Sequence, residues 1–168
     1  MSMVLIGNRL STDELQAVLN DPATVTTLLY GDLDDEDAEM PEPELDLDKS
    51  WHGIHYLLTG TAWEIGEGAS AAILGGEEIG EDGGYGPARI LRPELVRTIA
   101  AALDTLDVET LRARFNPAAM AAADIYPDGW ADVTDDVFDS YFAPYFTEPR
   151  RFYKTAAAND QAVLLAIT

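Results

Sequence analysis

The stretch DLDKSWHGIHYLLTG, residues 46–60, sets the first constraint on the fold. Its apolar residues Leu47, Trp51, Ile54 and Leu58 recur at spacings of four, three and four. On a helix this spacing places the side chains on one face, which must be buried against other elements. The pattern therefore predicts a helix from about residue 48 to residue 59 that packs against the core.

A polar stripe runs beside this apolar face. Asp48, His52, His55 and Thr59 have the same spacing, so on one helix they would share a face. A carboxylate and two imidazoles could bind a divalent metal, or the carboxylate could orient His52 as a general base. The favoured alternative is structural, with Asp48 capping the helix and the histidines pairing with buried polar groups. No metal is predicted, because Gly53 stands where a metalloprotease helix carries glutamate.

The segment before this helix contains a strand, a helix and an acidic loop. Residues 3–6 favour a strand that stops at Gly7, and Ser11 or Thr12 can cap the helix that follows. A mixed apolar run at 23–30 is compatible with a second short helix. Acids and prolines dominate residues 32–44, a composition that cannot bury surface, and they predict an exposed loop.

After residue 60 the sequence predicts mostly helices. Glycines dominate residues 75–86 and indicate an irregular segment, and Pro144 and Pro149 are expected to interrupt helical structure. The remaining predictions, in chain order, are one or two helical turns at 69–74, a strand at 89–91, a helix from Pro93, a helix after Asp107, a short helix capped by Asn116, a helix from Thr134, a helix at 150–158 and a buried strand at 162–167. Because the strands are few and far apart, we predict one α+β domain over residues 1–168, with several helices packed on a small mixed or antiparallel sheet.

The composition narrows the class of protein. Of the 168 residues 47% are hydrophobic, enough for one packed core. Lys and Arg number 10 against 31 Asp and Glu, and the net charge of -21 disfavours nucleic-acid binding because a negative surface repels phosphates. The chain has no cysteine, which excludes disulfides and thiolate sites. No segment resembles a leader peptide or a membrane span, so we expect a cytoplasmic setting without membrane association.

Two further sets of residues could recognise a ligand. The glycine-rich run at 75–89 contains Tyr85 and Arg89, but its acids would repel an anion and a strand follows it, so we reject a dinucleotide site and predict no cofactor. A tight structural loop is favoured there. Aromatic residues at helical spacing are expected in the core, and they include the tryptophans Trp51, Trp63 and Trp130.

A basic cluster stands out against the acidic background. Arg150, Arg151 and Lys154 would lie within one helical turn. Glu148 and nearby acids are expected to neutralise it, which favours a solvated helix face over a binding site.

Several blocks of sequence resemble a known family. The run at 46–60 combines an acid-Lys-x-Trp-His element with an aromatic-Leu-Leu-Thr-Gly ending, and it occurs with GGYGPARIL from Gly83, IYP from Ile125 and FYKTAAANDQAVL from Phe152. On these motifs the chain resembles the YfbM-like family of bacterial proteins over nearly its whole length. The resemblance implies an α+β fold and a cytoplasmic setting, and it implies no established reaction and no catalytic residue.

The function expected from these patterns is binding. An acidic surface and the lack of a recognisable catalytic signature favour a binding or interaction module, with a basic protein as the partner. The alternative is a small enzyme or ligand-binding protein that uses the Asp48, His52 and His55 face with Tyr85 and Arg89. The candidate binding residues are Asp48, Lys49, His52, His55, Thr59, Tyr85 and Arg89.

Overall fold

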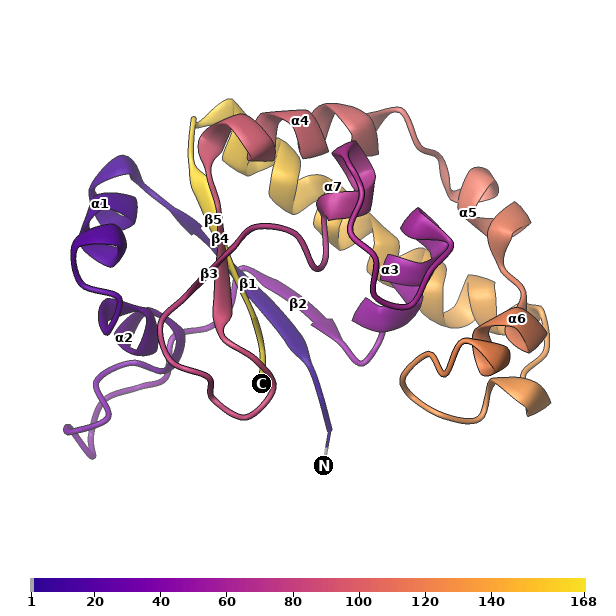
Figure 1. Cartoon of the computed structure of the whole chain (residues 1–168), viewed down its shortest axis with the longest axis horizontal. Coiled ribbons are helices and arrows are strands. Elements are labelled where there is room, and N and C mark those ends of the chain that lie inside the picture. Colours follow the sequence, from indigo (N-terminus) through magenta and orange to yellow (C-terminus); the bar gives the residue numbers. More distant parts are fainter. Residues whose placement is uncertain (1) are drawn as a thin grey trace.

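The computed structural model of the protein describes residues 2–168 and shows one five-stranded sheet within them. Its strand order is β2-β1-β5-β4-β3, and each neighbouring pair is antiparallel. Strand β1 (Leu5–Leu10) pairs along its whole length with β5 (Ala162–Ile167), so the two ends of the chain meet at the centre of the sheet (Figure 1). The predicted single α+β domain with an antiparallel sheet is confirmed.

The outer strands are short. β2 (Leu45–Asp48) pairs with β1, and β4 (Ala88–Leu91) joins β5 to the edge strand β3 (Glu77–Ile79). The prediction of a strand at 89–91 is confirmed, whereas β2 and β3 were not predicted.

Strand β1 also continues past Gly7, where a stop was expected. A Cβ at Gly7 would lie 2.8 Å from Cδ2 of Leu165, so the glycine makes room for its cross-strand neighbour.

The sheet separates a large core from a small one. Alternate residues of β5 face opposite sides, with Leu165 in the large core and Leu164 in the small one. The small core lies under α1 (Thr12–Asn20) and α2 (Thr24–Tyr30), at the left of Figure 1. The helices of the large core are α3 (Trp51–Thr59), α4 (Pro93–Asp104), α5 (Val108–Arg114), α6 (Pro117–Ala122) and α7 (Ala143–Ala158).

Several helices begin where the sequence predicts. The side chain of Ser11 accepts a hydrogen bond from the amide of Glu14, whose carboxylate accepts one from the Ser11 amide, and this reciprocal pair starts α1. Asn116 caps α6, and Pro93 lies in the first turn of α4. Between α6 and α7 the chain forms a 3₁₀ turn (Trp130–Asp132) and a π-helical turn (Phe138–Phe142). Another 3₁₀ turn, Gly68–Ala71, follows α3.

The prediction that Pro144 and Pro149 interrupt the last helix is wrong, because α7 contains both. Pro144 lies in the first turn, where an amide has no partner within the helix. Pro149 removes one hydrogen bond from the middle of the helix. Buried Phe146 and Phe152 on the same helix pack into the large core and hold the backbone helical through that point.

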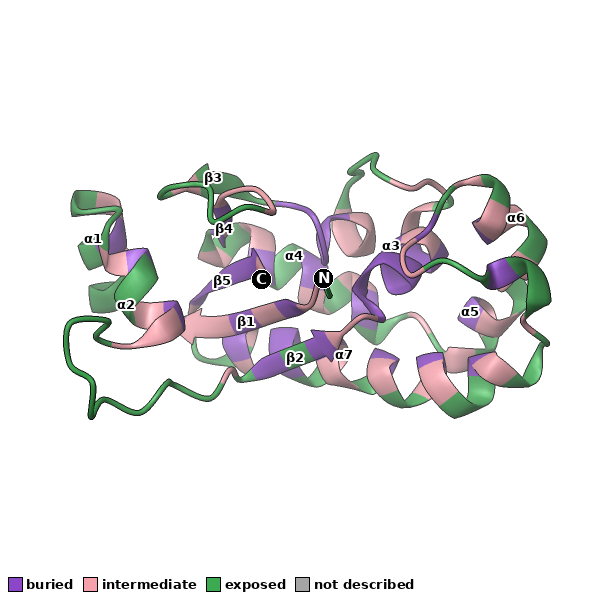
Figure 2. Ribbon diagram, turned by 90° about the horizontal axis from the view of Figure 1, so that it is seen from below, coloured by how far each residue is buried: buried purple, intermediate pink, exposed green. Residues whose placement is uncertain are grey.

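The loop at residues 31–44 is exposed, as predicted, and joins α2 to β2. Figure 2 shows it as a long exposed strip beside α1, α2 and β2. No helix among residues 2–168 is both long and apolar enough to span a membrane.

Candidate functional site

The polar stripe predicted for α3 is only partly present. Asp48 is the last residue of β2 and has a φ of 46°, and the helix begins three residues later at Trp51. Pairing with Leu5 holds Asp48 in the sheet, and its left-handed backbone turns the chain toward the helix. Asp48 therefore neither caps α3 nor shares a face with the histidines, and that prediction is wrong. Ser50 precedes the helix, and its hydroxyl donates to the carbonyl of Leu47 at 2.6 Å.

His52 is fully buried and both of its ring nitrogens are bonded. The amide of Tyr126 donates to Nδ1 at 2.9 Å, and Nε2 lies 2.8 Å from the carbonyl oxygen of Ala62. Because an amide can only donate, Nδ1 is the acceptor and Nε2 carries the proton. Burial lowers the pKa of His52 and outweighs the opposing effect of its bond to Ala62. The neutral ring therefore joins the segments that contain Ala62 and Tyr126 through one hydrogen bond to each.

His55 is also fully buried, but neither of its nitrogens has a hydrogen-bond partner among residues 2–168. Its pKa is lowered to about 4, chiefly by burial and also by the charges of His52 and Arg89, and the nearby Glu64 backbone opposes this shift without reaching hydrogen-bond geometry. Unpaired polar atoms in a core lower the stability of the fold, so the unpaired nitrogens of His55 are destabilising.

Arg89 approaches the histidines from the sheet. Its Nη1 donates to the carbonyl oxygens of Ile73 at 2.9 Å and Gly75 at 3.2 Å, while its buried Nη2 has no partner among residues 2–168. Its charge contributes to the lowered pKa of His55, so these two predicted residues lie near one another. Tyr85 lies in the loop between β3 and β4, and within the described residues no hydrogen bond or ring contact joins it to either histidine.

The remaining predicted residues have local roles. The Thr59 hydroxyl lies within hydrogen-bond distance of the His55 carbonyl, at 2.9 Å, and of the Thr61 carbonyl, at 3.0 Å, and so closes the end of α3. Lys49 lies half-buried between β2 and α3, and no carboxylate within residues 2–168 forms an ion pair with it.

The buried pair is poorly suited to chemistry in this conformation. His52 and His55 are sealed from solvent, and neither lines the groove or the basic pocket described below. Within residues 2–168 no three His, Asp or Glu side chains gather as a metal site requires. A substrate would have to open the core to reach either imidazole.

Trp63 was expected in the core, and the structure corrects this prediction. Its side chain is 62% exposed, whereas Trp51 and Trp130 are buried. The indole packs against the His52 ring, with centroids 4.4 Å apart and the two planes tilted by 39°. Its place between Gly60 and Gly66, outside any helical period, was the signal in the sequence that argued against burial.

A groove lies between α2 and the loop that joins β3 to β4. Two pockets of about 220 Å³ and about 490 Å³ share the lining residues Thr26 and Glu81 and therefore lie next to one another. The smaller pocket lies between two loops. Leu33 lines it from the acidic loop, and Glu81 and Asp82 line it from the glycine-rich loop. Apolar side chains from α2, β4 and β5 also line it, and these are Val25, Leu29, Ala88, Ala166 and Ile167. We call this feature the acidic groove.

Backbone hydrogen bonds hold Asp82, one of the two carboxylates of the acidic groove, in place. Oδ1 of Asp82 accepts from the amides of Gly84 at 2.7 Å and Gly86 at 2.9 Å, which fixes the loop around it. Both glycines have a positive φ, so the turn favours residues without a Cβ. Glu81 is exposed and forms no ion pair within the described chain.

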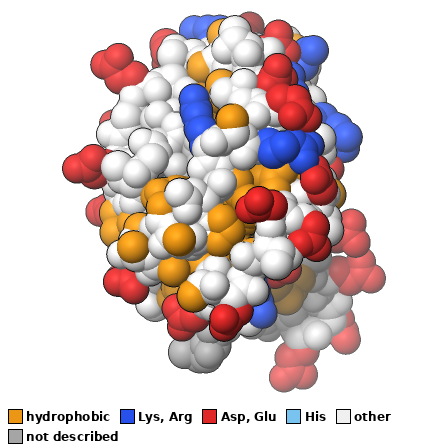
Figure 3. Space-filling view, turned by 90° about the vertical axis from the view of Figure 1, so that its right-hand side faces the viewer, with side chains coloured by type: hydrophobic (Ala, Val, Ile, Leu, Met, Phe, Trp, Pro, Cys, Tyr) orange, Lys and Arg blue, Asp and Glu red, His pale blue; other side chains and the backbone are white. Residues whose placement is uncertain are grey.

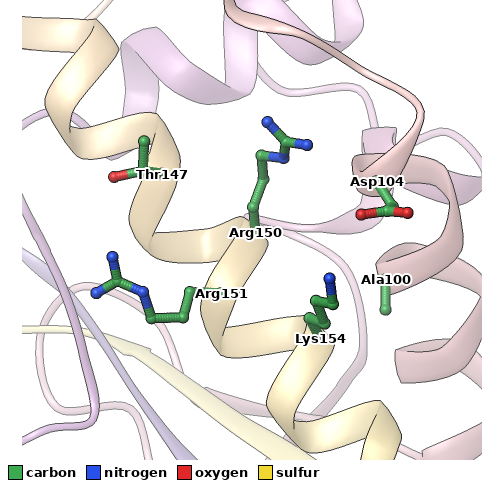
Figure 4. A pocket seen from close by; sticks show the side chains of 6 residues that line it. All are labelled: Ala100, Asp104, Thr147, Arg150, Arg151 and Lys154. Carbon is green, nitrogen blue, oxygen red and sulfur yellow. The ribbon is translucent and has the colours of Figure 1, made fainter.

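The basic cluster forms a shallow pocket of about 260 Å³ between α4 and α7 (Figure 4). Arg151 pairs with Glu148 at 3.5 Å, as expected, and Figure 4 shows it extending away from Asp104. Arg150 and Lys154 form no ion pair with any residue in 2–168, so the acids neutralise the cluster only in part.

Comparisons with known proteins establish the family and leave the activity open. The profile of a family described as a domain of unknown function (DUF1877) matches residues 1–166. The structure of YfbM from Escherichia coli, described as a protein of unknown function, is similar with a TM-score of 0.72 and 20% sequence identity over 100% of both chains. A search of curated proteins found no match. The YfbM-like resemblance of the sequence motifs is confirmed, and the chain belongs to the DUF1877 family.

Proposed function

We propose that this protein is a binding module that docks a basic segment of a partner protein in the acidic groove. The observation that carries the proposal is the combination of an apolar lining with unpaired carboxylate at the rim. Lysine and arginine have this same combination, because an aliphatic stem carries a charged end. Such a side chain could lay its stem on Leu29 and bring its charge to Glu81.

Long-range electrostatics support a basic partner. The net charge is -21, and the acidic loop at 31–44 lies beside α2 at the same end of the molecule as the groove (Figure 2). Leu33 joins the two features, since it belongs to the loop, is 70% exposed and lines the groove. A field of this sign speeds the approach of a cationic partner and slows that of nucleic acid. The proposal keeps the expectation of a cytoplasmic setting and of no nucleic-acid partner.

The enzyme alternative has weaker support. It needs a pocket that brings Asp48, His52 and His55 together with Tyr85 and Arg89. His55 and Arg89 lie near one another, but both imidazoles are buried and Asp48 lies outside the helix. We therefore favour the surface groove over the buried pair.

A defined basic peptide tests the proposal. We would measure its affinity by fluorescence anisotropy with a lysine- and arginine-rich peptide that also carries leucines, and compare an acidic peptide of equal length. Each exposed charge pair contributes roughly 0.2–1 kcal/mol, so Glu81→Gln should weaken binding by up to about fivefold. Affinity should also fall as salt rises from about 0.05 to 0.5 M.

Asp128→Asn is the matched control, since Asp128 is exposed and lines none of the described pockets. This variant removes the same charge from the net total, and it should change the affinity less than Glu81→Gln does. Cross-linking of the bound peptide should locate it at residues 22–33 and 80–88. Equal affinity for the acidic peptide, or cross-links that avoid both segments, would overturn the proposal.

A further inference from the structure

We propose that the exposed face of Trp63 is a fixed platform for one arginine or lysine side chain of the basic partner. The inference rests on the basic partner of the proposed function, and it adds a second contact point that does not depend on the acidic groove. The platform consists of Trp63 with the flanking acids Glu64 and Glu67, in the loop that leaves α3.

The exposure of Trp63 is the first observation. Trp63 and Ile65 are 62% and 54% exposed, and residues 63–67 are all exposed. Leaving an indole in water forgoes much of the free energy that its burial would supply. Large exposed aromatic side chains are typical of interaction surfaces, where tryptophan is enriched among the residues that contribute most to binding.

The second observation is that this loop is held in place by hydrogen bonds. The carbonyl of Ala62, next to Trp63, accepts from Nε2 of buried His52, and the Glu64 amide donates to the Thr61 hydroxyl at 3.1 Å. The Thr61 amide donates to the Thr59 hydroxyl at 3.1 Å. The backbone that carries the indole is therefore held in place, and a partner has little loop entropy to remove on binding.

The third observation concerns charge. The indole packs against the His52 ring, which is neutral because Nδ1 accepts from the Tyr126 amide. A neutral neighbour leaves the electron-rich face of the indole free to attract a cation. Glu64 and Glu67 lie in the same exposed loop and form no ion pair within residues 2–168, so their negative charge favours a cation at this loop. An anionic side chain would meet repulsion from both.

The test compares two peptides of equal length and similar side-chain size, one cationic and one neutral. The first is the basic peptide described above, and the second carries citrulline in place of arginine and norleucine in place of lysine. With the tryptophans labelled as 5-fluorotryptophan, the ¹⁹F signal of exposed Trp63 should shift with the basic peptide and stay unchanged with the neutral one. This measurement uses the unmutated chain and does not depend on the folding of a variant.

Substitutions then measure the contribution. A cation over an indole contributes roughly 0.5–2 kcal/mol, so Trp63→Leu should lower the affinity of the protein for the basic peptide by about two- to thirtyfold. The affinity of Trp63→Phe should lie between those of the native protein and Trp63→Leu, because a phenyl ring attracts a cation less strongly than an indole does. Ile65→Ala is the matched control, since it shortens an exposed apolar side chain in the same loop without removing a ring.

The outcomes separate this inference from the proposed function. If Glu81→Gln weakens the peptide while Trp63→Leu does not and the ¹⁹F signal is unmoved, the platform is excluded and the groove stands. If Trp63 responds but Glu81→Gln has no effect, the groove is excluded and the platform stands. If the basic peptide binds neither the native chain nor any variant, both are overturned.

Discussion

His52 and His55 lie on the same face of α3 and are equally buried, yet their surroundings differ. His52 is bonded at both nitrogens and joins the Ala62 and Tyr126 segments, whereas His55 is bonded at neither. Histidine therefore stabilises the fold at position 52, where it joins two segments, and destabilises it at position 55, where its nitrogens are buried without partners. The sequence shows two histidines three residues apart and cannot distinguish these roles.

The contrast predicts opposite effects of the same substitution. His52→Leu leaves the Tyr126 amide and the Ala62 carbonyl without partners, and should lower the free energy of unfolding by about 2 to 4 kcal/mol. His55→Leu removes nitrogens that have no partner and should be neutral or stabilising at pH 7. Urea unfolding of the two variants measures the difference. Equal destabilisation would show that the His55 ring is hydrogen-bonded in the folded protein, with the nearby Glu64 backbone as the first candidate partner.

His55 also predicts how stability depends on pH. Its pKa is about 4 in the folded protein and near 6.5 when unfolded, so between these values the unfolded chain binds more protons. The free energy of unfolding should therefore fall as pH falls from about 6.5 toward 4, by at most roughly 3 kcal/mol for the full shift. Carboxylates titrate in the lower part of this range, so the quantity to measure is the difference between native protein and His55→Leu. Parallel pH profiles would contradict the lowered pKa.

At the scale of the element, Gly53 shows how tightly α3 packs. A Cβ at this position would lie 2.5 Å from Cζ of Phe142, in the π-helical turn before α7. Glycine in a helix ordinarily costs about 1 kcal/mol relative to alanine, so Gly53→Ala would stabilise an unpacked helix. Here the clash should reverse the sign and lower the free energy of unfolding by about 1 to 3 kcal/mol. Gly83→Ala is the control in thermal unfolding, because a Cβ there meets nothing within 4 Å.

How far an element can be predicted depends on whether its signal is local. α4, α6 and β5 follow from a first-turn proline, an asparagine cap and an apolar run, which need no distant partner. β2 and β3 form because β1 and β4 lie beside them, and their short acidic sequences resemble the neighbouring loops. The continuity of α7 through Pro149 likewise comes from burial of its inner face, which outweighs the local cost of proline.

The same distinction between local signals and tertiary packing applies to the residues of the candidate site. The helical period correctly placed His52 and His55 together, but the period could not show that Asp48 belongs to a strand. The approach of Arg89 to His55 depends on how the sheet and α3 pack, and the exposure of Trp63 depends on where the chain leaves the core. Sequence therefore identified the residues with unusual chemistry better than it identified which of them face solvent.

At the scale of the whole molecule, charge is the dominant surface property. The chain has 31 acids against 10 basic residues, and Figure 3 shows acidic side chains around the rim of the visible face as well. The acidity is therefore wider than the loop at 31–44. Of the basic residues, Arg9, Arg92, Arg97, Arg112 and Arg151 are already paired with acids, so most carboxylates within residues 2–168 have no ion-pair partner. Mutual repulsion among them opposes the folded state.

This repulsion predicts that sodium chloride stabilises the fold. The melting temperature should rise between about 0.02 and 0.3 M salt, because screening weakens the repulsion between unpaired acids more than it weakens the few surface ion pairs. A variant with Asp32, Asp34, Asp35 and Asp37 replaced by asparagine should melt higher at low salt and gain less from added salt. Asparagine keeps the oxygens of Asp32 and Asp35 that accept from the loop amides, so the substitutions remove charge and leave those turns intact. A melting temperature that falls with salt would mean that the ion pairs outweigh the repulsion, and it would weaken the case for an acidic surface held open for a basic partner.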